Sequence, residues 1–126
     1  MNGINQYKTI GVESASPHKL IQMLFETYLM RVDQAVIAIE QKDMSAKGIA
    51  ISKALAILGG LEEGLDLEKG GELAEQLQGL YRYARERLLV ATDKNETAPL
   101  TEARELIFQI KDAWDQIPEE FHYHQG

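Results

Sequence analysis

Histidine and carboxylate side chains are the groups in this sequence that could do metal or acid–base chemistry, and their spacing argues against it. The chain has three histidines, His18, His122 and His124, and no cysteine. A di-iron helical bundle needs glutamates and Glu-x-x-His pairs that face its interior, but none of the histidines lies in the interior of a predicted helix. His122 and His124 are better interpreted as part of a solvated tail than as a metal pair. We therefore expect no cofactor and no metal.

Other catalytic arrangements are also missing. The sequence contains no Ser/His/Asp set and no Gly-rich phosphate loop. A phosphorelay bundle needs an exposed histidine in mid-helix, whereas His18 stands in a first helical turn, where we expect a surface residue beside a cap. A basic cluster that Glu86 interrupts indicates a solvated helix face or a contact for an acidic patch on a partner; its members are Arg82, Arg85 and Arg87. The sequence predicts a protein that is not an enzyme.

Composition indicates a soluble, cytoplasmic (cytosolic) protein. The 126 residues fit one domain, which we place at 1–118 with an N-terminal arm at 1–15 and a flexible tail at 119–126. The net charge of −7 disfavours binding to nucleic acid, which requires cationic neutralisation of phosphates. No charged-then-apolar leader and no run of about 18 apolar residues is present, so we expect no membrane insertion.

Capping residues and prolines divide the chain into four predicted helices. Ser16 and Pro17 are typical of a helix start, Asp43 is the expected N-cap of the second helix, and Pro118 follows the last. Apolar residues recur at helical spacing in each segment, and no strand pattern competes. The predicted helices cover about 17–41, 44–65, 72–91 and 97–117, with the last start near Asn95 or Thr97. Short connections predict an all-α, antiparallel up-down-up-down four-helix bundle with a short N-terminal arm, mobile or helical.

Two adjacent glycines, Gly70 and Gly71, stand between the second and third apolar repeats. Glycine inside a helix costs about 0.5–1 kcal/mol relative to alanine, so a pair needs a reason. We interpret it as the corner at which the chain reverses, and place it before the third helix or in its first turn. Gly59 and Gly60 also lie in a helical pattern, where they weaken the helix or permit another backbone to approach closely.

The helices carry more apolar residues than a bundle core needs. The surplus either widens the core or reaches the surface, where a large apolar patch usually has a use, such as a groove for a partner helix. The surplus residues are Met23, Leu24, Leu29, Met30, Val36, Ile37, Ile49, Ile57, Tyr83, Leu89 and Val90.

Three sequence blocks resemble the flagellar secretion chaperone family, FliS, in order and at matching spacing. They are SASPHKLIQMLFE at 14–26, AKGIAISKALAIL at 46–58 and LDLEKGGELAEQLQGLYRYARERLLVA at 65–91. Ala113 and Trp114 look like the tryptophan site of the family's last helix. The resemblance covers the chain from Gly3 to about Ile117.

This resemblance implies a four-helix type III export chaperone that acts by binding. Its members bind the C-terminal segment of flagellin in the cytoplasm, prevent premature polymerisation, and deliver flagellin to the cytoplasmic domain of the export gate. Some also bind the flagellar anti-sigma factor, so a helical adaptor for a regulatory protein is the alternative function. The flagellin segment becomes helical on binding, and buried apolar area has to offset its ordering entropy.

We therefore expect a flagellin-binding groove and a regulated arm. Ile4 and Tyr7 match an isoleucine and a tyrosine that the family places three residues apart in its terminal arm, which implies a role in export-gate docking. The expected groove residues are Leu20, Leu24, Ile49, Ile57, Leu61, Leu80, Tyr81 and Leu88.

Overall fold

The computed structural model describes residues 16–118 and 120, and most of them are helical. Four α-helices follow one another: α2 (Pro17–Glu40), α3 (Met44–Glu63), α4 (Leu67–Lys94) and α5 (Ala98–Asp115). The described residues contain no strand. The predicted all-α fold is confirmed. The expected arm at 1–15, with Ile4 and Tyr7, and the tail residues 119 and 121–126, with His122 and His124, lie outside the described residues.

Side-chain caps fix where the first two helices begin. Ser16 Oγ accepts a hydrogen bond from the Lys19 backbone N–H at 3.0 Å, and Pro17 occupies the first helical position. Asp43 Oδ1 accepts one from the Ala46 backbone N–H, also at 3.0 Å. These caps satisfy backbone donors that have no partner within the helix. Both predicted starts are confirmed.

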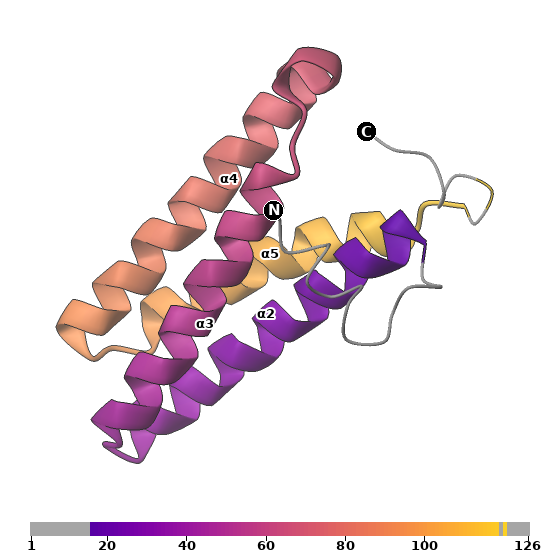
Figure 1. Ribbon diagram of the computed structural model, residues 1–126. Coiled ribbons are helices and arrows are strands. Elements are labelled where there is room, and N and C mark those ends of the chain that lie inside the picture. Colours follow the sequence, from indigo (N-terminus) through magenta and orange to yellow (C-terminus); the bar gives the residue numbers. More distant parts are fainter. Residues whose placement is uncertain (1–15, 119, 121–126) are drawn as a thin grey trace.

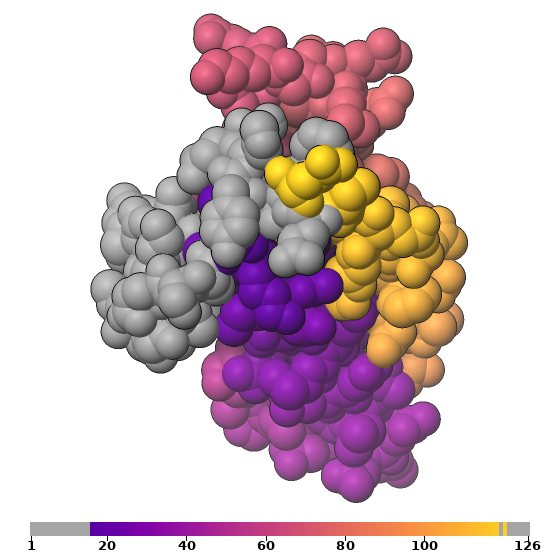
Figure 2. Space-filling view, turned by 90° about the vertical axis from the view of Figure 1, so that its right-hand side faces the viewer, coloured from indigo at the N-terminus to yellow at the C-terminus, as the bar shows by residue number. Residues whose placement is uncertain are grey.

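The helices form an antiparallel up-down-up-down bundle (Figure 1). Each packs against two others, α2 and α4 both lying on α3 and α5. We call the end at which α2 passes to α3, and α4 to α5, the closed end. At the opposite, splayed end, the α3–α4 tip diverges from the start of α2 and the end of α5 (Figure 1). Figure 2 shows this tip, in pink, standing clear of the rest.

The core runs along most of α2 and α3. The contiguous core takes only the later half of α4, from Tyr81 to Ala91, and only the first half of α5, from Leu100 to Ile107. Tyr28 of α2 is fully buried, and its hydroxyl donates a hydrogen bond to the Ala103 carbonyl at 3.3 Å. Burial raises the pKa of the Tyr28 phenol far above its ordinary value, so the hydroxyl stays protonated. The core therefore ties α2 to α5.

The expected corner at Gly70 and Gly71 is confirmed in part. The first turn of α4 begins after the N-cap Asp66, before the glycines, but the helix is broken by a kink at Gly71, and its regular part follows that kink. Gly71 has φ 53° and ψ −131°, a conformation that kinks the helix and that side chains resist. A Cβ on Gly70 would stand 2.6 Å from the Ala74 Cβ. The pair therefore allows a kink within a helix start, and the capping aspartate four residues earlier sets the turn.

The end of α4 is stabilised by a buried lysine from α3. The helix continues past the predicted end near Ala91 to Lys94, and Asn95 closes it in the left-handed conformation, with φ 55° and ψ 37°. Lys47, only 7% exposed, donates from Nζ to the Thr92 carbonyl at 3.1 Å and to Asn95 Oδ1. A cation is favourable at a helix C-terminus, where carbonyls lack partners.

Candidate binding surface

Most of the expected groove residues are buried inside the bundle. Ile49 is 56% exposed on α3, and Leu80 is half-buried on α4. The others are less than 9% exposed; they are Leu20, Leu24, Ile57, Leu61, Tyr81 and Leu88. Burial raises the pKa of the Tyr81 phenol to about 12, as expected for a hydroxyl in an apolar interior. A role for these side chains in binding a partner stays a prediction.

The outward side of α3 consists mostly of small side chains, with one large apolar residue and one lysine among them. We call this the α3 outer face; its exposed members are Ser45, Gly48, Ile49, Ser52, Lys53 and Ala56, with Gly59 and Gly60 half-buried. An 18-residue stretch of α3 has a mean hydropathy of 1.3, so by length and composition alone the helix could cross a membrane. Only 39% of that stretch is buried inside the bundle. A core helix of a soluble protein meets the same criterion. What distinguishes α3 is apolar surface that its own bundle leaves uncovered.

The glycines of this face have no packing role within residues 16–118. A Cβ built on Gly48, Gly59 or Gly60 meets nothing within 4 Å. None of the three has a positive φ, so an alanine would fit each position without backbone strain. Because glycine in a helix costs about 1 kcal/mol relative to alanine, three such positions on one helix need a cause outside the described residues.

Exposed apolar side chains also occur on the two helices that pack against α3. Met30 and Ile37, on α2, are 45% and 51% exposed. Leu89, on α4, is 50% exposed. The sequence had marked all three as surplus to the core, and the structure places them on its surface. With Ile49, each of the three helices therefore exposes at least one large apolar side chain.

An acidic hub anchors α4 beside α3. Glu62 accepts hydrogen bonds from Arg85 Nη2 at 2.8 Å, from Arg82 Nε at 3.0 Å and from Gln78 Nε2 at 3.3 Å. Partial burial raises the pKa of the Glu62 carboxyl, but the hydrogen bonds from Arg85 and Arg82 outweigh it and hold the pKa below its ordinary value. Two members of the predicted basic cluster thus bind a carboxylate of the same chain. The third, Arg87, forms an ion pair with α5, in which its Nε lies 2.6 Å from Glu102 Oε1.

His18 is buried, contrary to the expected surface position. It is 5% exposed, and its ring stacks on Trp114 of α5 with centroids 4.7 Å apart. The expectation was wrong because the end of α5 covers the first turn of α2, which the sequence of α2 alone does not reveal.

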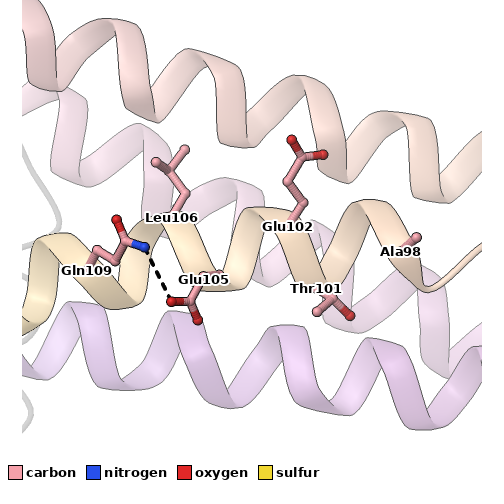
Figure 3. Close-up of a pocket in the computed structure, with 6 residues that line it drawn as sticks. All are labelled: Ala98, Thr101, Glu102, Glu105, Leu106 and Gln109. Carbon is pink, nitrogen blue, oxygen red and sulfur yellow. Dashed lines mark hydrogen bonds between the residues drawn. The ribbon is translucent and has the colours of Figure 1, made fainter.

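An open hollow of about 710 Å³ runs along α5 (Figure 3). It is lined by Ala98, Thr101, Glu102, Glu105, Leu106 and Gln109. The one hydrogen bond drawn there is from Gln109 to Glu105, at 3.3 Å. The lining includes no nucleophile paired with a base. Over residues 16–118 and 120, no group of three or more histidines and carboxylates could hold a metal ion.

Comparison with known families agrees with this picture of a binding protein. The family model described as "Flagellar protein FliS" matches residues 1–120. The chain belongs to the FliS family. Members are similar along almost their whole length. A flagellar secretion chaperone FliSB of Pseudomonas aeruginosa is 43% identical over 121 residues, covering 93% of this chain and 96% of the relative.

Other members are similar over a comparable share of their length. The flagellar secretion chaperone FliS of Salmonella typhimurium is 45% identical over 121 residues, covering 92% of this chain and 90% of the relative. That of Bacillus subtilis is 32% identical over 115 residues, covering 91% and 85%. The predicted family is therefore confirmed, and the chain is a flagellar secretion chaperone by family.

Proposed function

We propose that this chaperone binds the C-terminal segment of flagellin on the surface centred on the α3 outer face. Binding is stoichiometric and involves no catalysis. It takes place in the cytosol, keeps flagellin from polymerising early, and allows delivery to the cytoplasmic domain of the flagellar export gate. The observation that carries the proposal is α3 itself, a helix of high hydropathy whose outward side is exposed among the residues that the structure describes.

The chemistry of this face favours a helical partner. Small side chains leave space in which the bulky aliphatic side chains of a second helix can sit, and glycines let two backbones approach closely. Met30 and Ile37 of α2 and Leu89 of α4 expose further apolar area on the helices that pack against α3. A segment that is disordered when free must offset its ordering entropy on binding, and contiguous apolar area supplies that free energy.

The remaining parts of the proposal concern other partners. Ile4 and Tyr7 in the N-terminal arm are proposed to act in export-gate docking. The alternative client is the flagellar anti-sigma factor, and no described feature favours it over flagellin. Lys53 is the one basic residue named on the α3 outer face, and the chain carries a net charge of −7, so apolar burial is the main attraction we propose.

Calorimetry with a flagellin C-terminal peptide tests the function. We expect tight one-to-one binding with a negative heat-capacity change, the mark of buried apolar surface.

Gly48→Ala and Gly59→Ala should each raise the free energy of unfolding by about 0.4–1 kcal/mol, because alanine restricts the unfolded chain and fits the helix. The same changes should weaken peptide binding by roughly tenfold, since each methyl group holds the partner helix away.

Gly79→Ala is the matched control. Gly79 is an exposed glycine of α4 with nothing within 4 Å of a built Cβ, so the variant should gain stability without losing affinity. Peptide that fails to bind the wild type at micromolar concentration would refute the function. Binding that is unchanged in both α3 variants would leave the client in place and refute the α3 outer face as its site.

A further inference from the structure

The first turn of α4 is separated from the rest of that helix by the kink. It begins after Asp66, whose side chain accepts a hydrogen bond from the Lys69 N–H at 3.0 Å and whose carbonyl accepts one from the Gly70 N–H at 2.7 Å. At Gly71 the backbone then leaves the helical region, with φ 53° and ψ −131°. The turn at 67–70 is therefore capped on its own, and a single residue joins it to the regular part of α4.

Few contacts hold this turn against the other helices. The first side chain of α4 with a hydrogen bond to α3 is Gln78, which donates to Glu62 at 3.3 Å. Over the part of the chain that the structure describes, no side-chain hydrogen bond or ion pair joins 67–77 to another helix. Figure 2 shows the α3–α4 tip standing clear of the rest of the bundle. The turn therefore loses little if it moves.

The apolar pattern of α4 does not match the direction in which this turn points. Four apolar residues follow one another at intervals of seven, and a continuous helix would place them on one side; they are Leu67, Ala74, Tyr81 and Leu88. The last three are at most 4% exposed, whereas Leu67 is 43% exposed. Leu67 thus continues the buried side of α4 in sequence but lies at the surface in the kinked helix.

Both glycines favour the kink over a continuous helix. Gly71 adopts a conformation that residues with a Cβ resist. A Cβ on Gly70 would stand 2.6 Å from the Ala74 Cβ, whereas Cβ atoms four residues apart in a regular helix are about 5–6 Å apart. In a continuous helix neither position would require glycine, and each glycine would weaken the helix relative to alanine. Alanine at the two positions should therefore favour the continuous form.

We propose that Gly70 and Gly71 form a hinge with two positions, the kinked one and a continuous α4 in which Leu67 returns to the buried side of the helix. In the kinked position the α3–α4 tip presents Leu67 to solvent, and in the continuous position the helix withdraws it. The first turn keeps its Asp66 cap in both, since the cap hydrogen bonds lie wholly within that turn. The hinge thereby controls which apolar side chain the splayed end exposes.

Distances between two spin labels on the full chain test the hinge. The protein has no cysteine, so paired cysteine substitutions label only the chosen sites. Glu68→Cys with Glu86→Cys spans the kink, and Glu75→Cys with Asp93→Cys lies entirely in the regular part of α4; all four side chains are exposed. The members of each pair are 18 positions apart, which is five turns and about 27 Å in a continuous helix.

We expect the wild-type background to give a shorter distance for the pair that spans the kink than for the other pair, because the first turn leaves the helix axis. In Gly70→Ala/Gly71→Ala the two distances should become equal, whereas the matched control Gly79→Ala should keep them different. Equal distances in the wild-type background would overturn the kinked position. A distance that stays short in the double variant, or that spreads without a defined value, would overturn the continuous position.

Thiol labelling provides a second readout that concerns Leu67 alone. The thiol of Leu67→Cys should react with a maleimide several-fold more slowly when both glycines are alanine than when they are present. Leu73→Cys is the control, because Leu73 is 64% exposed and follows the hinge, so its rate should not change. Gly70→Ala alone removes the space beside Ala74 and should slow the reaction in the same direction, which keeps the test valid if the double variant does not fold. Equal rates for Leu67→Cys in all these backgrounds would overturn the hinge.

Discussion

At the residue scale, glycine has two opposite roles in this protein. Gly71 is required by a backbone conformation that other residues resist, and Gly70 by the closeness of Ala74. Gly48 and Gly79 are helical positions with open space around the missing Cβ. Sequence spacing alone cannot separate these roles, because they depend on a dihedral angle and on neighbours in space. For this reason the sequence did not show that Gly70 and Gly71 lie within α4, after its capping residue Asp66.

Alanine at Gly71 should therefore lower the free energy of unfolding, whereas alanine at Gly48 or Gly79 should raise it. With φ 53° and ψ −131°, Gly71→Ala is expected to lower the free energy of unfolding by about 1–3 kcal/mol, the cost of a strained backbone. Urea unfolding followed by far-UV circular dichroism measures it, with Gly79→Ala as the stabilised counterpart. If Gly71→Ala were as stable as the wild type, the kink would not be a fixed part of the native state.

At the scale of helices, polar residues decide how pairs of elements meet. Glu62 holds α3 to α4 through two arginines and a glutamine, and Lys47 closes the end of α4 from α3. Such ties were not predicted, because the residues that form them are 16 to 48 positions apart. The helices themselves were predictable, since caps and apolar periodicity are local signals.

The assignment of apolar residues to core or surface was less predictable, for a related reason. A helix such as α2 or α3 has apolar side chains on more than one side, so its sequence does not reveal which side its neighbours cover. Ile49 and Ile57 both occur in α3 and are chemically identical, yet the first is 56% exposed and the second 8%. Only the crossing of the helices distinguishes them.

The Glu62 hub predicts a specific dependence of stability on pH. Its carboxyl has a lowered pKa in the folded protein, so near that pKa the unfolded state binds more protons. The hub therefore stabilises the fold above the ordinary value of about 4.5, and the contribution is lost as the pH falls through the folded pKa. Glu62→Gln should be less stable than the wild type at pH 7, and the difference should shrink between about pH 5 and pH 3.

A coupling cycle provides the control for the hub. Once Glu62 is a glutamine, the further change Arg85→Gln should cost less than it does in the wild type, because the charged partner is gone. Thermal melts of the four proteins at pH 7 give the comparison. Additive effects of the two substitutions would show that the hydrogen bonds to Glu62 do not stabilise the fold.

At the scale of the whole molecule, the core runs along most of α2 and α3 but takes only the halves of α4 and α5 that lie towards the closed end. Leu88 and Leu100 are fully buried in those halves, whereas the stacked rings of His18 and Trp114 and the hydrogen bonds to Glu62 join helices towards the splayed end. On α4, buried and exposed apolar residues follow each other directly in the sequence.

Two neighbouring leucines test this division. Leu88 is 0% exposed and Leu89 is 50% exposed. Leu88→Ala should cost about 2–5 kcal/mol of unfolding free energy through a core cavity, whereas Leu89→Ala should change stability by less than about 0.5 kcal/mol and weaken binding of the flagellin peptide. Urea unfolding and calorimetry give the two quantities. Equal losses of stability would contradict the separation of core and surface on α4.

The stacking of Trp114 on His18 has a spectroscopic consequence. The chain has one tryptophan, and it stacks on His18 at the end of α5, so tryptophan emission reports the splayed end and is nearly insensitive to the closed end. A fluorescence transition and a circular dichroism transition coincide only when both ends unfold together. A fluorescence midpoint at lower denaturant concentration than the circular dichroism midpoint would therefore show that α2 separates from α5 before the fold is lost. Trp114 thus serves as an intrinsic probe of that step.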